Sequence, residues 1–144
     1  MIVMGASLGG LKAVQTLLSG LPPSFPLPIV LALHRHKEGD DLLRHSLQRH
    51  TALRVIEVMD KEPIQPAHVY LGPPDYHLLV EQDCFSLSAD EPVQFARPSI
   101  DVLFESAADI SLTVPELLRP FYYRRSSAGV SLATRRCRRR RLRW

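Results

Sequence analysis

The chain lacks any long hydrophobic run. Its 144 residues contain no stretch of about 18 apolar residues, so no segment is predicted to span a membrane. The N-terminus also lacks the basic start of a signal peptide, and Gly9-Gly10 interrupts its apolar stretch after a few residues. We therefore expect a cytoplasmic protein.

Cysteine is scarce as well. Cys84 and Cys137 are the two cysteines of the chain, and they suggest neither a disulfide framework nor a metal site. No set of histidines and cysteines has the spacing of metal ligands. The sequence thus gives no reason to expect a metal or a cofactor.

Acidic residues are missing from one end of the chain. Residues 124–144 contain nine arginines and no acid, whereas residues 1–123 contain nine basic and fifteen acidic residues, a balance of −6. The net charge of +3 therefore combines a mildly acidic domain with a basic tail. Tails of this kind bind nucleic acid or are simply solvated. Because the tail is the one feature that points to nucleic acid, we do not expect a nucleic-acid partner.

The hydrophobic pattern that is present alternates between strand and helix. Continuous apolar runs without alternation indicate strands buried on both faces, and runs at helical spacing lie between them. The order predicts an α/β fold, a doubly wound, mostly parallel, Rossmann-like sheet with helices on both faces and one antiparallel hairpin. The predicted strands cover residues 2–4, 28–34, 54–58 and 68–72, the hairpin 77–88, and the helices 11–20, 39–50 and the segment after Pro98.

Two residues at predicted strand ends could perform chemistry together. Ser7, in the G-x-S-x-G sequence of residues 5–9, follows the first strand, and His34 follows the second. A histidine can take the proton of a serine hydroxyl and make it a nucleophile. Three interpretations of the glycine-rich segment stay open on the pattern alone: a nucleophile turn, a phosphate-binding turn or a plain tight turn. His34 taken alone is better explained as a capped strand-end histidine than as a base.

Several segments together resemble the catalytic domain of the chemotaxis protein-glutamate methylesterases, the CheB family. They are "GASLGG", His34, "QPAHVYLGPPDYHLLV" and "ARPSIDVLFESAA", and the resemblance covers roughly residues 2–109. The family usually has threonine where Leu8 stands, glycine at Pro74 and a more polar pair at Phe95-Ala96.

The resemblance implies a carboxylic ester hydrolase with a Ser–His–Asp triad. Carried over, Ser7 is the nucleophile and His34 the general base. The substrates would be glutamate γ-methyl esters on the cytoplasmic helices of chemoreceptors, with deamidation of glutamines in some members. Family members commonly carry a receiver domain, and a receiver or methyltransferase domain in a fuller protein is a further partner. Without one, we expect a stand-alone domain or a fragment of a fusion.

Three more residues match the family motifs without an assigned role. Asp75 and His77 could order the rim of the site or take part in the chemistry. Arg97 could steer an acidic receptor surface or cap the helix that follows it.

The resemblance breaks down near the C-terminus. Residues 128–134 resemble the strand before the family's glycine-rich aspartate turn, but "RRCRRRRLRW" follows, and the place of the aspartate falls on Arg138. If the arginines of 135–141 are encoded CGN and Cys137 TGY, reading one base later yields Gly, Ala, Asp or Val codons alone. That alphabet fits the family's turn, so we interpret the tail as frameshifted, with a genuine basic tail as the alternative.

This interpretation divides the chain in two. Residues 1–134 form a methylesterase-like catalytic domain that is incomplete at its C-terminus, with an unpaired sheet edge or an uncovered helix face. Residues 135–144 form a basic tail that we expect to be disordered or detached from the core. An inactive remnant, or a receptor-binding domain without catalysis, stays open as the alternative function.

Overall fold

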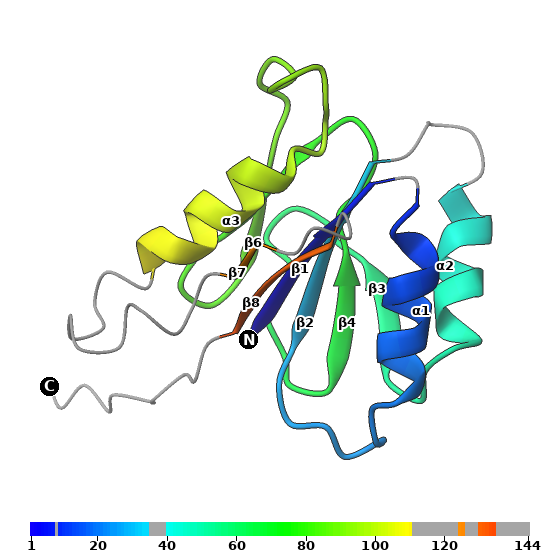
Figure 1. Ribbon diagram of the computed structural model, residues 1–144. Helices are drawn as coiled ribbons and strands as arrows, with labels where there is room; N and C mark the ends of the chain where they lie inside the picture. The colour runs from blue at the N-terminus through cyan, green and yellow to red at the C-terminus, as the bar shows by residue number, and fades with distance from the viewer. Residues whose placement is uncertain (8, 35–39, 111–123, 126–129, 135–144) are drawn as a thin grey trace, which may run out of the picture.

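A central sheet with helices on both faces forms the protein (Figure 1). The computed structural model describes residues 1–7, 9–34, 40–110, 124–125 and 130–134. The expectation for residues 135–144 lies outside these described residues. No helix among the described residues is long and apolar enough to cross a membrane.

The parallel part of the sheet has the predicted strands. Their order across the sheet is β3-β4-β2-β1, and each pairs with its neighbour in parallel. β2 is buried at every position, as expected for a strand covered on both faces. The four strands are β1 (Ile2–Ala6), β2 (Ile29–Leu33), β3 (Arg54–Glu57) and β4 (His68–Leu71).

A C-terminal strand covers the β1 edge of the sheet. β8 (Val130–Thr134) pairs with β1 in the antiparallel direction, and β7 (Arg124–Arg125) pairs with β8. The sequence led us to expect an unpaired edge or an uncovered helix face, and at β1 the edge is paired. An exposed row of backbone N–H and C=O groups is a template for any available strand, and β8 occupies it.

The helices divide between the two faces of the sheet. α1 (Leu11–Ser19) and α2 (Asp40–Gln48) lie on one face, and α3 (Ile100–Asp109) lies on the other (Figure 1). α1 ends at Gly20, as predicted. The Ser99 side chain accepts a hydrogen bond from the Val102 amide, so Ser99 is the N-cap of α3. The doubly wound fold is thereby confirmed.

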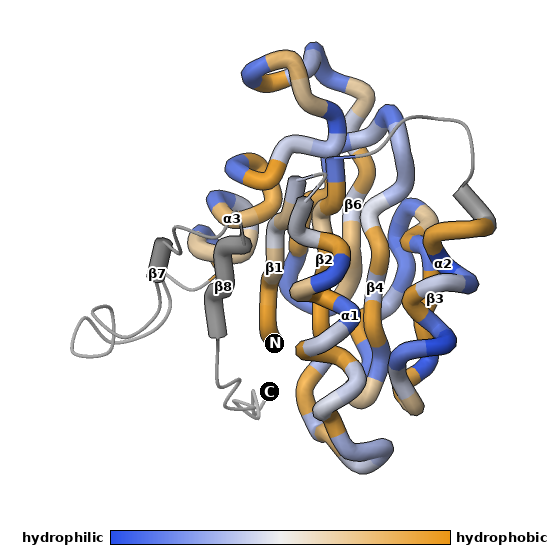
Figure 2. Tube along the Cα trace, turned by 45° about the vertical axis from the view of Figure 1, so that its right-hand side comes forward, coloured by the Kyte–Doolittle hydropathy of each residue, from blue (hydrophilic) through white to orange (hydrophobic). Residues whose placement is uncertain are grey.

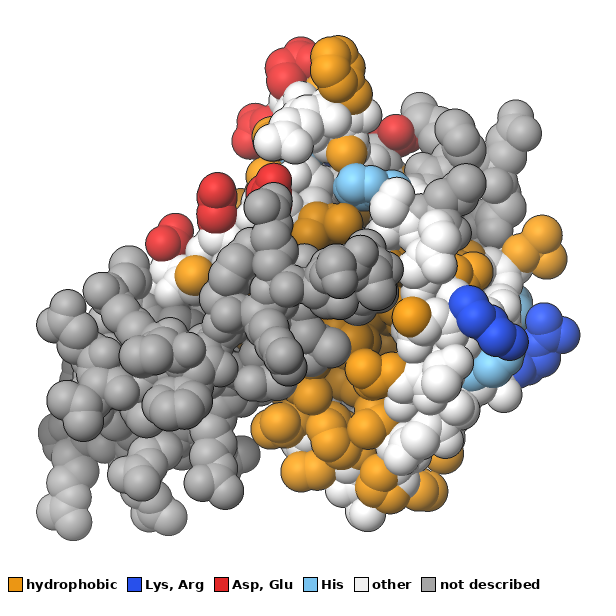
Figure 3. Space-filling view, in the orientation of Figure 1, with side chains coloured by type: hydrophobic (Ala, Val, Ile, Leu, Met, Phe, Trp, Pro, Cys, Tyr) orange, Lys and Arg blue, Asp and Glu red, His pale blue; other side chains and the backbone are white. Residues whose placement is uncertain are grey.

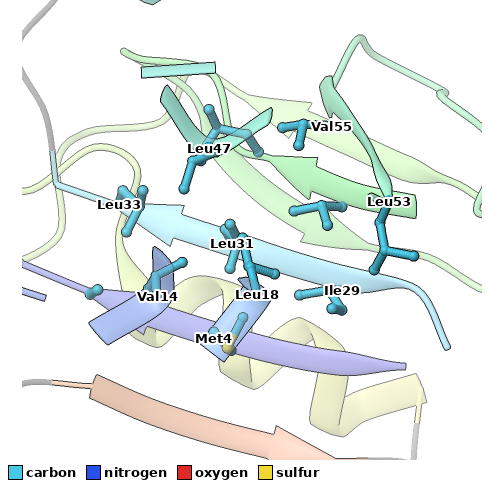
Figure 4. Packing of buried hydrophobic residues seen from close by; sticks show 12 residues of the cluster. Met4, Val14, Leu18, Ile29, Leu31, Leu33, Leu47, Leu53 and Val55 are labelled. Atoms are coloured by element: carbon cyan, nitrogen blue, oxygen red, sulfur yellow. The ribbon is translucent and has the colours of Figure 1, made fainter. Parts of the chain in front are cut away.

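The core has two hydrophobic clusters, one on each face. In the first, Val14 and Leu18 of α1 point toward Met4 and Leu31 of the sheet (Figure 4). In the second, Leu103 of α3 packs with residues of the opposite strand faces and of the hairpin. Apolar residues concentrate along the strands, while the helices mix apolar and polar residues (Figure 2).

The predicted hairpin forms a separate two-stranded sheet. It consists of β5 (His77–Val80) and β6 (Phe85–Ser88), with Gln82 and Asp83 in the connection. The Ser106 hydroxyl of α3 accepts a hydrogen bond from the Val80 amide at 3.1 Å. This bond joins α3 to the hairpin.

The phenol of Tyr70 gives a prediction about stability and pH. It donates to the Pro63 carbonyl (3.1 Å) and accepts from the Gln65 amide (2.8 Å). Tyr70→Phe leaves both backbone groups without that partner, and we expect a loss of about 1–2 kcal/mol in the free energy of unfolding. Urea unfolding measures it, with Tyr76→Phe as the control because Tyr76 is exposed.

The same pair of variants tests the pH dependence. Burial raises the pKa of Tyr70, and the Gln65 hydrogen bond partly offsets that rise. The folded state therefore favours the neutral phenol, and Tyr70 contributes stability that is full below about pH 10 and falls as pH rises further. The difference in stability between wild type and Tyr70→Phe should therefore stay constant from pH 7 to about pH 9.5 and shrink as the pH rises above about 10. A constant difference would contradict the assignment.

Candidate active site

Ser7 and His34 lie at the same edge of the sheet, at the carboxyl ends of β1 and β2. Ala6 pairs with Leu33 in the parallel register, and the His34 amide donates to the Ala6 carbonyl at 3.1 Å. This bond extends the pairing by one residue, so His34 lies opposite Ser7. Neighbouring strands are about 4.8 Å apart. The two residues that the sequence suggested are thus neighbours across the strands.

The alternation of side chains defines the side on which the pair lies. Ala6 and Leu33 belong to the core cluster under α1 and α2, whereas Ala32 belongs to the cluster under α3. Continued for one residue, this alternation puts Ser7 and His34 on the α3 side of the sheet.

The Ser7 side chain is exposed and His34 is half-buried. Within the described residues, no hydrogen bond joins the two side chains, and no carboxylate is hydrogen-bonded to His34. Catalytic hydrogen bonds are often long before substrate binds. The triad roles therefore stay predictions. Arg138, where the resemblance places the triad acid, lies outside the described residues.

The glycines around Ser7 serve close packing rather than unusual backbone angles. A Cβ added at Gly5 would lie 2.2 Å from Cγ2 of Ile100, at the start of α3. One added at Gly10 would lie 2.6 Å from Cβ of Ala6, whereas one at Gly9 would meet nothing within 4 Å. None of the three has φ in the left-handed region. Two of them instead let α1 and α3 approach the strand end.

The N-terminus of α1 lies beside Ser7. The Gly10 amide donates to the Ser7 carbonyl at 2.7 Å, and α1 begins at the next residue. Among the residues that the structure describes, no side chain caps this helix. The first-turn N–H groups of a helix lack intrahelical partners and form a positive dipole end. An oxyanion formed next to Ser7 would therefore meet free donors.

His77 connects the start of α3 to the loop before it. The buried imidazole accepts the Ser99 amide at Nδ1 (3.1 Å), and Nε2 lies 3.1 Å from the Glu91 carbonyl. Because the amide can only donate, the proton is assigned to Nε2, which donates to Glu91. Of its two predicted roles, the structure shows His77 ordering the rim.

Arg97 holds the same loop. Its Nη1 donates to the carbonyls of Ala89 (2.9 Å) and Asp90 (3.0 Å). We expected this guanidinium either to face the receptor or to cap α3, and the contacts show a third role at the base of the loop. Asp75, on the rim, has φ 62°, a conformation that Asp tolerates better than most residues.

The described part of the chain contains no candidate metal-binding site. There, no group of three or more His, Cys, Asp or Glu residues is placed to hold an ion. The chemistry that the arrangement can support is nucleophilic: an accessible hydroxyl, an imidazole on the next strand and an uncapped helix start.

The chain matches known proteins over the same region. The family model "CheB methylesterase" matches residues 2–113. A Leptospira interrogans protein named "Putative protein-glutamate methylesterase/protein-glutamine glutaminase" is 44% identical over 110 residues, which cover 76% of this chain and 57% of that protein. A Halalkalibacterium halodurans protein-glutamate methylesterase/protein-glutamine glutaminase is 37% identical over 114 residues, 76% of this chain and 33% of its own length.

A solved structure shows the same fold. The crystal structure of the Thermotoga maritima CheB methylesterase catalytic domain matches with a TM-score of 0.71 and 31% identity, covering 75% of this chain and 59% of that one. The chain thus spans a little over half the length of that domain and of the Leptospira relative. The match to the family model and to these relatives shows that the chain belongs to the CheB methylesterase family.

Proposed function

We propose that the protein hydrolyses glutamate γ-methyl esters on the cytoplasmic helices of chemoreceptors, releasing methanol. One observation carries the proposal: in a chain of this family, Ser7 and His34 lie opposite each other at the carboxyl edge of adjacent parallel strands. Such edges hold the ligand in open α/β sheets. Glutamines at the same receptor positions would be deamidated by the same steps.

The steps follow from the residues present. His34 takes the proton of the Ser7 hydroxyl, and the serine oxygen attacks the ester carbonyl. The first-turn amides of α1 stabilise the oxyanion. The protonated imidazole then gives its proton to the leaving methoxide, and methanol departs. Water, activated by the neutral His34, cleaves the acyl-enzyme and restores Ser7.

The proposal does not identify a residue as the third member of the triad, the aspartate. A triad aspartate orients the histidine and stabilises its protonated form, and its loss lowers kcat by about 10⁴-fold. We infer that this chain lacks that aspartate, because the family's position for it falls on Arg138. The second candidate function follows from this: a domain that binds receptor helices without hydrolysing them.

Methanol release separates the two functions. A methyl-labelled receptor fragment is incubated with the chain, and we expect labelled methanol above the buffer rate. Release at the buffer rate, together with retained binding of the fragment, would replace hydrolysis by the binding function. Removing the tail after Tyr123 tests the nucleic-acid alternative, because DNA binding that survives this truncation cannot come from the basic tail.

A further inference from the structure

A fully exposed aromatic side chain lies on the loop above the site. Phe95 is 104% exposed, more than any other large hydrophobic residue among those described. It belongs to the loop of residues 89–97, which extends beyond the carboxyl ends of the strands in both views (Figures 1 and 2). Val93, on the same turn, is exposed as well, and aromatic residues are enriched at protein interfaces, so the tip of this loop is a candidate contact surface.

The backbone holds Phe95 in a strained turn. Val93 and Ala96 exchange both backbone hydrogen bonds, at 3.2 and 3.0 Å, across the two residues between them. Those residues, Gln94 and Phe95, have φ of 50° and 62°. Turns with two positive φ angles favour Asn and Gly, so Gln-Phe is an unfavourable choice for folding. Strain of this kind persists only where the surroundings hold it, and it gathers at functional sites.

The loop is fixed at its base and connected to the candidate site. Arg97 binds the carbonyls of Ala89 and Asp90, and His77 binds that of Glu91. His77 also binds the Ser99 amide at the start of α3, which packs against Gly5, two residues before Ser7. The turn is therefore part of the rim and not a separate flap.

We propose that Phe95 is the hydrophobic anchor on which the helix of the protein substrate docks, beside the ester that Ser7 attacks. This rests on the proposed function. Asp90 and Glu91 are exposed on the same loop, where acidic side chains gather beside apolar ones (Figure 3). The fitting partner is thus an amphipathic helix with an aliphatic residue toward Phe95 and neutral or basic residues toward the acids.

Two substrates separate docking from chemistry. Phe95→Ala should raise KM for a methylated chemoreceptor fragment about tenfold or more, as loss of an aromatic anchor does. The same variant should hydrolyse N-acetyl-glutamate γ-methyl ester at the parent rate, because this small ester carries no helix that would dock on Phe95. Leu42→Ala is the matched control, since Leu42 is an exposed residue of α2, on the opposite face of the sheet from α3.

A second variant separates docking from folding. Gln94→Asn with Phe95→Gly gives the turn the residues it prefers, so it should unfold at the parent temperature or higher. It should nevertheless bind the fragment as weakly as Phe95→Ala. Affinity is measured by fluorescence anisotropy in a Ser7→Ala background, which stops turnover.

The outcomes distinguish the two proposals. If the parent hydrolyses neither substrate but binds the fragment through Phe95, the proposed function fails and docking stands. If the parent hydrolyses both and Phe95→Ala leaves KM unchanged, docking is wrong and the proposed function stands. A parent that does not bind the fragment, or a turn variant that binds at full strength, also overturns the anchor.

Discussion

Replacing Ser7 by alanine is expected to lower kcat for methyl-ester hydrolysis by about 10²-fold. In hydrolases with a complete triad, loss of the serine costs about 10⁶-fold and loss of the aspartate about 10⁴-fold. An enzyme that lacks its aspartate has already lost about 10⁴-fold of that rate. Loss of the serine can then lower kcat only by the remaining factor of about 10². The size of the decrease reports on the third member of the triad without any need to locate it.

His34→Gln provides the matched comparison. Members of a triad act as one unit, so His34→Gln should lower kcat as much as Ser7→Ala, and the double variant should lower it no further. Initial rates of methanol release from the small ester measure all three. A decrease near 10⁶-fold would show that a carboxylate outside the described residues serves His34, and the inference of a missing aspartate would then be wrong. Unchanged rates would remove Ser7 from the chemistry.

Much of the fold could be predicted because its strands are buried on both faces. A doubly covered strand such as β2 must be apolar at every position, and few other structures require such a run. The strands then fix the site, because β1 and β2 run parallel and their carboxyl ends meet at one edge. Ser7 and His34 could be placed side by side on that basis alone.

The packing around the site could not be predicted, since it depends on residues far apart in the chain. Gly5 is explained by Ile100, and no local pattern connects the two. The turn at Gln94 and Phe95 could not be predicted for a local reason: its residues are not those that such turns prefer. The antiparallel direction in which β8 pairs with β1 likewise could not be predicted, because no local pattern specifies which edge a strand joins.

Replacing Gly5 by alanine is expected to lower the free energy of unfolding by about 3 kcal/mol, the upper end of the usual cost of overpacking a core. The new methyl group would lie 2.2 Å from Cγ2 and 2.8 Å from Cγ1 of Ile100. Cβ of Ile100 would lie 3.0 Å away as well, and rotation of the side chain does not displace that atom. The start of α3 must therefore move away from β1.

Gly9→Ala is the matched control, because it makes the same substitution in the same motif where a Cβ would meet nothing within 4 Å. Gly5→Ala should lower the melting temperature by roughly 5–10 °C, whereas Gly9→Ala should change it little. In an Ile100→Ala background, which removes both clashing atoms, Gly5→Ala should cost much less, giving a favourable coupling energy. Additive costs would show that Gly5 is required for another reason.

Because the moved helix start also carries the Ser99 amide that His77 accepts, Gly5→Ala should weaken binding of the receptor fragment as well. The Ile100→Ala background should restore part of that binding if the contact between α3 and β1 positions the rim.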